Sequence, residues 1–250
     1  MKLKFVLILL ALSFFSCEKE PKVNLVVKGK IEGIRKGDMY LQKLEDTMLI
    51  DLDSVRFSSN EDFKLKAFIE EPQLMFLYLK KFGSEEDAEY LNFFAEAGEF
   101  EFNVKMEDFS RAKAEKAPEN QQKYEAFIET LKRFNDQNLD LISERIQTPE
   151  TDTLAQQEID KKYKSLLRRK YLYTVNYAVT NSDLEIAPFL VLSEAYDVNK
   201  RFLDTVYNSL DANVKDSKYG KELKALLDVR NEEANKQNIE VETLDEDVNS

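Results

Sequence analysis

The sequence of 250 residues contains no histidine and a single cysteine, Cys17. Without imidazole there is no Ser-His-Asp or Cys-His relay, no histidine-ligated metal centre and no ordinary proton shuttle at neutral pH. One cysteine also excludes an internal disulfide, a C-x-x-C redox pair and a thiolate zinc site. We therefore expect no catalytic residue, no metal site and no cofactor, and we predict that the protein is not an enzyme.

Glycine and proline are also scarce, with 6 and 5 residues, which excludes collagen-like and low-complexity architectures. What the chain does contain is 43% hydrophobic and 34% charged residues, a balance that permits a packed core. Acidic residues outnumber basic ones by 48 to 36, giving a formal net charge of −12 at pH 7. This excess of acid argues against a nucleic-acid partner.

No N-terminal apolar run is long enough to cross a bilayer, because the run at residues 5–15 is about half of the ~20 residues that a spanning helix needs. Two lysines precede this run and Ser16-Cys17 follows it, as in a bacterial lipoprotein signal that is cleaved before a cysteine. We expect residues 1–16 to be the signal peptide, Cys17 to be the lipidation site and residues 17–23 to be a tether. The alternative is an ordinary signal peptide with an accidental cysteine.

These features predict a location in the bacterial cell envelope, with the protein held on a membrane by its lipidated N-terminus. We expect this membrane to be the outer membrane. Lipidation would also block a lone thiol that is a liability in an oxidising compartment. The predicted partners are thus the membrane itself and a protein of the envelope.

Residues 24–113 show a period of two, which indicates β-strands. The clearest example is the stretch at 99–106, in which Phe100, Phe102, Val104 and Met106 alternate with polar residues. The other expected strands cover residues 23–31, 39–44, 48–57, 63–69, 74–79 and 90–95. The stretch at 74–79 is apolar on both faces, which predicts a central strand between two packed layers. Seven short strands separated by turns predict an antiparallel β-sandwich or open barrel.

At Pro118 the period changes to about 3.5 residues, which predicts a helical domain over residues 118–235 and an α+β fold class overall. The first helix turns one face of large side chains inward and ends at Thr148-Pro149. That face consists of Tyr124, Phe127, Leu131, Phe134, Asn138, Leu141 and Arg145. A second helix is expected at 153–180, with its packing side chains directed toward a partner helix. These side chains are Ile159, Tyr163, Leu166, Leu167, Tyr173 and Tyr177.

A third helix should be capped by Asn181 or Ser182 and should carry Pro188 in its first turn, where the missing N–H is tolerated. The last two helical patterns cover residues 200–210 and 219–233. Residues 236–250 are acidic and contain no aromatic side chain, so we predict a disordered acidic tail.

Between residue 17 and about residue 232, the chain resembles the N-terminal region of bacterial thioredoxin-like lipoproteins, in which a domain of unknown function is followed by a helical linker. The residues that carry the resemblance are Ser16-Cys17, Val26–Ile31, Met39-Tyr40-Leu41, Asp53-Ser54, Phe63, Asn181-Ser182, Ala187-Pro188 and Tyr219–Leu223. Glu61 departs from it where glycine is frequent, and Lys116-Ala117 departs where Gly-Ser or Gly-Thr is frequent. The relatives continue into a thioredoxin fold with a C-x-x-C motif that this sequence lacks. The resemblance therefore carries over no catalytic residue.

Three groups of charged residues were weighed as sites. Asp51 and Asp53 resemble the start of a calcium loop, but Arg56 stands at the sixth position, so acids beside a strand are the better interpretation. The acidic pairs Glu70-Glu71 and Glu232-Glu233 follow from the composition. A basic run interleaved with tyrosines favours a solvated helix face over anion or RNA binding. This run comprises Lys161, Lys162, Lys164, Arg168, Arg169 and Lys170.

The leading functional hypothesis is a membrane-anchored lipoprotein with a non-catalytic binding or scaffolding role. In it the β domain presents the recognition surface and the helices support it. The alternative is an accessory factor of envelope thiol-disulfide exchange that acts through a cysteine-bearing partner. An enzyme is the third class, and the sequence offers neither a Gly-rich phosphate loop nor a nucleophile elbow in its favour.

Overall fold

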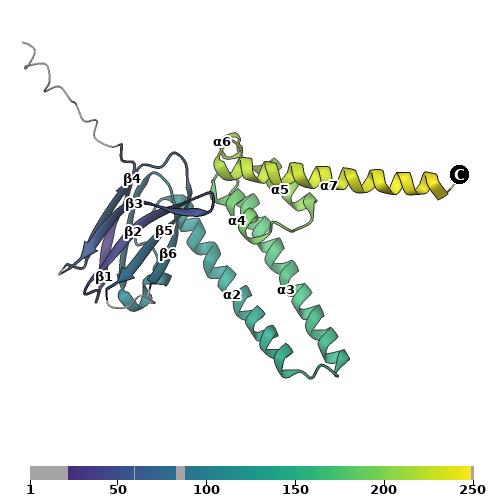
Figure 1. The fold of residues 1–250 in the computed structure, drawn as a ribbon, viewed down its shortest axis with the longest axis horizontal. Coiled ribbons are helices and arrows are strands. Elements are labelled where there is room, and N and C mark those ends of the chain that lie inside the picture. Colours follow the sequence, from purple (N-terminus) through teal and green to yellow (C-terminus); the bar gives the residue numbers. More distant parts are fainter. Residues whose placement is uncertain (1–21, 59, 83–87, 249–250) are drawn as a thin grey trace, which may run out of the picture.

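The computed structural model describes residues 22–58, 60–82 and 88–248, and the side chains up to residue 233. The predicted signal peptide, Cys17 and most of the tether lie outside these residues. Seven strands come first in the chain and a group of helices follows them, so the predicted α+β fold class is confirmed (Figure 1).

The strands form two sheets that face each other as a sandwich. One sheet has the order β4-β1-β7 and the other has the order β3-β2-β5-β6. The bounds are β1 (Leu25–Glu32), β2 (Gly37–Glu45), β3 (Met48–Phe57), β4 (Asp62–Ala67), β5 (Gln73–Lys81), β6 (Ala88–Ala95) and β7 (Gly98–Lys105). Neighbouring strands are antiparallel except for β1 and β7, which are parallel. The predicted sandwich is therefore confirmed, with one pairing that the purely antiparallel prediction missed.

The core of the sandwich consists of the side chains that the period of two directs inward. The ring of Phe93 lies 5.2 Å from that of Phe100 and 5.9 Å from that of Phe102, both edge-on, so the two sheets interlock through aromatic side chains. The β1–β7 pair also approaches closely at Gly29, where a Cβ would lie 1.9 Å from the main-chain oxygen of Phe102. Only glycine fits there.

The predicted packed layers on both faces of the strand at 74–79 are only partly present, although β5 lies centrally in its sheet, between β2 and β6. Its inward residues Met75, Leu77 and Leu79 are fully buried. Its outward residues are only partly buried, however, since the helices cover this face at the Leu74 end and leave the rest open.

The helical unit starts after η2 (Met106–Arg111). Its helices are α2 (Glu119–Gln147), α3 (Thr153–Thr180), α4 (Ile186–Glu194), α5 (Lys200–Ser209), α6 (Ala212–Lys215) and α7 (Lys218–Val248). Helices α2 and α3 form an antiparallel hairpin that projects away from the sandwich (Figure 1). The predicted break at Thr148-Pro149 and the predicted second helix are both confirmed. No helix among the described residues is long and apolar enough to span a membrane.

Tyr163 is 43% exposed, but it lines a hollow between α2 and α3, which agrees with its predicted direction toward a partner helix. Two details of the helical prediction are wrong. The N-cap of α4 is Glu185, because the Asn181 side chain instead donates to the Tyr177 carbonyl at 2.8 Å and ends α3. Residues 236–248, predicted to be disordered, continue α7. They contain no glycine or proline, so a helix nucleated by the buried Leu223 and Leu227 can extend through them.

The two units are joined at Phe94, which is fully buried although it lies on the outer face of β6. Its ring is 5.3 Å from the ring of Phe189 in α4 and 5.8 Å from that of Tyr219 in α7. Gln121 Oε1 accepts the main-chain N–H of Phe94 at 2.7 Å, and the Tyr219 hydroxyl accepts that of Leu74 at 3.1 Å. The sheet and the helices therefore share one apolar and hydrogen-bonded junction, as the change of period at Pro118 predicted.

Candidate functional site

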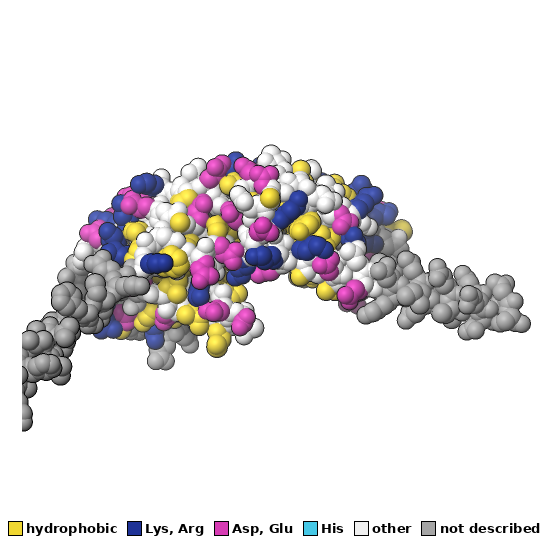
Figure 2. All heavy atoms as spheres, turned by 90° about the horizontal axis from the view of Figure 1, so that it is seen from above, with side chains coloured by type: hydrophobic (Ala, Val, Ile, Leu, Met, Phe, Trp, Pro, Cys, Tyr) yellow, Lys and Arg dark blue, Asp and Glu magenta, His cyan; other side chains and the backbone are white. Residues whose placement is uncertain are grey.

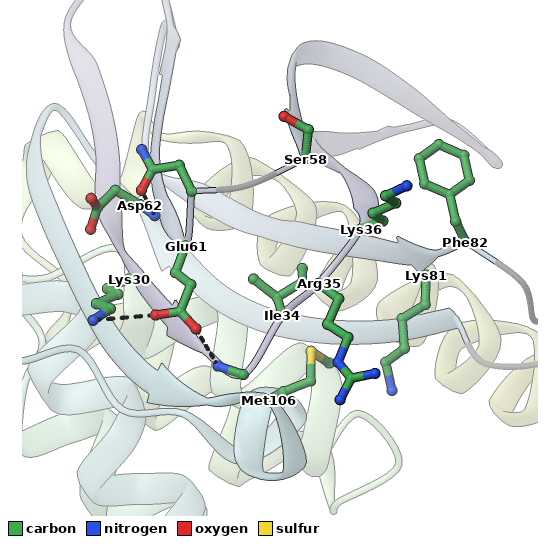
Figure 3. Close-up of a pocket in the computed structure, with 12 residues that line it drawn as sticks. Lys30, Ile34, Arg35, Lys36, Ser58, Glu61, Asp62, Lys81, Phe82 and Met106 are labelled. Atoms are coloured by element: carbon green, nitrogen blue, oxygen red, sulfur yellow. Dashed lines mark hydrogen bonds and ion pairs between the residues drawn. The ribbon is translucent and has the colours of Figure 1, made fainter.

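A hollow of about 860 Å³ lies at the strand ends of the sandwich, between the β1–β2 turn, the start of β4 and the end of β5 (Figure 3). The Glu61 carboxylate accepts the main-chain N–H of Gly33 at 2.7 Å and meets Lys30 Nζ at 3.3 Å. These two contacts, the Gly33 bond above all, lower the pKa of Glu61. Glu61, which stands where the resemblance often has glycine, therefore links the β1–β2 turn to the turn that precedes β4.

Basic side chains predominate around this hollow, but they are partly neutralised. Lys81 is paired with Glu89 at 2.6 Å, and Lys30 is paired with Glu61 at 3.3 Å. The lining combines this charge with the apolar Ile34 and Met106 (Figure 3). Such a lining can hold a small ligand. It includes two carboxylates, Glu61 and Asp62, of which Glu61 is engaged by Gly33 and Lys30.

A second hollow, of about 740 Å³, lies between the four-stranded sheet and helices α4 and α7. Glu71 Oε2 accepts the main-chain N–H of Lys218 at 2.5 Å and so satisfies a donor at the start of α7. One turn later, burial raises the pKa of Glu222, and Glu71 raises it further. Burial also raises the pKa of Tyr219 to about 12. Glu70 and Glu71, the pair that the composition explained, both line this hollow at the junction of sheet and helices.

A third hollow, about 480 Å³ in volume, forms a groove along β6. We define the β6 groove by three segments that line it, namely Tyr90–Asn92 of β6, Ser110–Lys113 at the end of η2 and just after it, and one face of α2 between Gln121 and Lys132. Lys113 Nζ lies 2.7 Å from Glu129 Oε2, and Glu125 Oε1 accepts the main-chain N–H of Ala114 at 2.8 Å. These contacts tie the segment after η2 to α2, so both walls of the groove are held in place.

Three tyrosines form a stack across the outer face of the four-stranded sheet, beside this groove. The ring centres of Tyr40 and Tyr78 are 5.8 Å apart and those of Tyr78 and Tyr90 are 4.8 Å apart, with interplanar angles of 28° and 24°. The tyrosine stack comes from β2, β5 and β6, so only the strand register brings it together. The period of two within one strand cannot align rings from three strands, so the sequence does not predict this stack.

Asp51 and Asp53, the two acids that resemble the start of a calcium loop, are engaged in hydrogen bonds within the sandwich. Asp51 Oδ1 accepts from Gln42 Nε2 at 2.7 Å, and Asp53 Oδ2 accepts the main-chain N–H of Lys66 at 2.7 Å. Within the described part of the chain, no three acidic or cysteine side chains come together as metal ligands. Cys17 lies outside the described residues, and its lipidation stays a prediction.

Three residues of the basic run on α3, namely Lys161, Lys162 and Lys170, are paired with acids on other helices or on α3 itself. Lys162 lies 2.6 Å from Glu144, and Lys170 lies 2.8 Å from Glu194. On the face seen in Figure 2, acidic and basic side chains are interspersed over the surface. The solvated-face interpretation of this run fits these contacts.

Residues 25–122 match a family model described as a domain of unknown function, DUF4369. The match covers the seven strands, η2 and the first turn of α2. The resemblance to a domain of unknown function is thereby confirmed for these residues, and its link to thioredoxin-like lipoproteins stays a prediction. No curated protein and no solved structure shows significant similarity to the chain.

Proposed function

We propose that this chain, whose residues 25–122 form a DUF4369 domain, is a membrane-anchored envelope lipoprotein with a binding role. The lipid attached to Cys17 holds it on the membrane. The sandwich is the recognition unit, and the helices support it rigidly. The proposal treats the protein as non-catalytic, because the sequence has no histidine and its one cysteine is assigned to the anchor.

The observation that carries the binding role is the β6 groove. It lies where the recognition unit meets its support, and both of its walls are fixed by contacts between segments far apart in the chain. A preformed groove of this kind binds without the entropic cost of ordering its own walls. The charged groups on its walls, apart from Lys132 at the rim, are engaged in ion pairs and main-chain hydrogen bonds, which fixes their positions before a partner binds.

A second candidate role is that of an accessory factor in envelope thiol-disulfide exchange. Its support is the resemblance of residues 17–232 to the N-terminal region of thioredoxin-like lipoproteins. Exchange needs an attacking thiolate and a resolving sulfur, and this chain offers only Cys17. In this role the reactive cysteines therefore belong to the partner.

Site-specific photocrosslinking in the intact envelope tests the proposal. A photoreactive residue would replace Ile128 in the β6 groove, Phe82 in the hollow at the strand ends, or Phe68 in the junction hollow. Leu154 on the hairpin, which is 75% exposed, is the matched control. We expect a discrete protein adduct from Ile128 and none from Leu154. Failure to obtain a discrete adduct from any of the three hollows would overturn the binding role, and an adduct with a thioredoxin-like protein would favour the second candidate.

A further inference from the structure

The main-chain N–H and C=O groups along the outer edge of β6 are candidates for hydrogen bonds to a ligand. β6 is an edge strand of the four-stranded sheet, next to β5 alone. In an antiparallel pair, directly opposed residues alternate between a hydrogen-bonded pair and a pair whose N–H and C=O groups point away from each other. The register of β6 on β5 therefore decides which of its groups point outward.

Three hydrogen bonds fix that register. Phe94 donates its N–H to Gln121, and its opposite residue Leu74 donates to Tyr219, so this pair is not hydrogen-bonded to each other. On the other side of β5, Phe82 donates its main-chain N–H to the Lys36 carbonyl at 3.2 Å. The main-chain N–H and C=O groups of the even-numbered residues of β5 therefore point toward β2. The same alternation directs the N–H and C=O of Tyr90 and Asn92 away from β5.

These outward groups open into the β6 groove, which Tyr90, Leu91 and Asn92 line. No described residue donates to or accepts from the main-chain N–H or C=O of Tyr90 or Asn92. Two positions further along the same edge, Gln121 supplies the acceptor that the amide of Phe94 needs. The edge is thus closed by a side chain of α2 at Phe94 and left open at Tyr90 and Asn92.

We propose that the β6 groove binds an extended peptide segment of another protein, which adds as a strand to the edge of β6 at Tyr90 and Asn92. This inference rests on the proposed binding role and names the class of partner. Strand addition supplies main-chain hydrogen bonds for affinity, and the groove walls read alternate side chains.

The walls define the chemistry of that peptide. Tyr124 and Ile128 of α2 and Ala112 of the opposite wall are apolar, which selects an apolar side chain at alternate positions. Lys113 is paired with Glu129, whereas Lys132 at the rim has no ion-pair partner among the described residues. An acidic residue in the peptide near Lys132 complements this charge.

A single extended strand fits this site better than a second copy of the chain. The edge lies between α2 and the Ser110–Lys113 segment, so one strand can enter from the open side. A second sandwich would bring its own neighbouring strands and its own α2 against these walls. Edge-to-edge pairing of two copies is therefore the competing outcome that the test must reveal.

The test is selection of peptides from a display library of random ten-residue sequences on the full chain, purified in detergent. Selected peptides would then be measured against variants by fluorescence anisotropy. Ile128→Glu places a charge in the groove wall, and Leu139→Glu makes the same change on the same helix outside the groove. Their side chains are 38% and 62% exposed, so both variants should fold. Asn92→Pro removes an outward N–H that β5 does not use.

We expect selected peptides with alternating apolar residues, and a loss of affinity of about tenfold or more for Ile128→Glu and Asn92→Pro. Leu139→Glu should bind as the unmodified chain does. If Asn92→Pro fails to fold, Ile128→Glu alone decides. Enrichment of no peptide, equal binding by Ile128→Glu, or concentration-dependent dimerisation that blocks the groove would overturn this inference. A crosslink from Ile128 without peptide binding would overturn it and leave the proposed binding role standing.

Discussion

Replacing Phe94 with alanine should destabilise the whole chain, because this ring fills the junction between the sheet and the helices. Phe→Ala changes at fully buried sites cost about 3–5 kcal/mol of unfolding free energy. The ring centres of Phe189, Tyr219 and Tyr124 lie 5.3, 5.8 and 6.5 Å from that of Phe94. The hydrogen bonds of Gln121 and Tyr219 to the sheet hold the helices at this distance, so the cavity cannot close. We therefore expect a loss in the upper half of that range.

Urea unfolding followed by circular dichroism measures this loss. Phe68→Ala is the control, since that side chain is 49% exposed and its removal should change the unfolding free energy by less than about 1 kcal/mol. A loss of less than about 1.5 kcal/mol for Phe94→Ala would refute the reasoning. It would mean that the two units do not depend on this contact.

Gly29→Ala should prevent β1 and β7 from pairing, because its Cβ would lie 1.9 Å from the main-chain oxygen of Phe102; a soluble variant that keeps the wild-type circular dichroism spectrum would contradict this. Glu222→Gln should stabilise the protein at pH 7, because burial raises the pKa of this carboxyl in the folded state and its ionised form is disfavoured there. That gain should vanish as the pH falls below the ordinary value of 4.5, and urea midpoints that shift equally at pH 7 and pH 3.5 would argue against it. Cys17→Ser should release the protein from the membrane, and retention of the variant in membranes washed at high salt would argue against the lipid anchor.

The sequence predicts the strands well because each one alternates locally with a period of two, and the strand at 48–57 has the bounds of β3. The parallel pairing of β1 with β7 escapes prediction, since it depends on segments that are about seventy residues apart and on a close approach at Gly29. The buried Asn120 and Gln121 also escape it. Both read as polar helix residues, whereas in the fold they bind Glu96 and the edge of β6.

The β6 groove was not predicted because none of its segments carries a distinctive motif. Tyr90–Asn92 reads as part of an ordinary strand, Ser110–Lys113 falls in no predicted strand or helix, and Ile128 lies outside the predicted packing face of the first helix. The site exists only where the three segments meet. Local patterns indicate only that strands are followed, from Pro118 onward, by helices that pack on the sheet.

Amide hydrogen exchange of the unliganded protein, followed by NMR, tests the open edge of β6 most directly. The register predicts an alternation along this strand, in which the amides of Leu91 and Phe93 exchange slowly because they are bonded to β5. The amide of Phe94 should also be protected by Gln121, whereas those of Tyr90 and Asn92 should exchange much faster than their neighbours. If Asn92 exchanges as slowly as Leu91 and Phe93, the edge is already occupied and the account of the β6 groove is wrong.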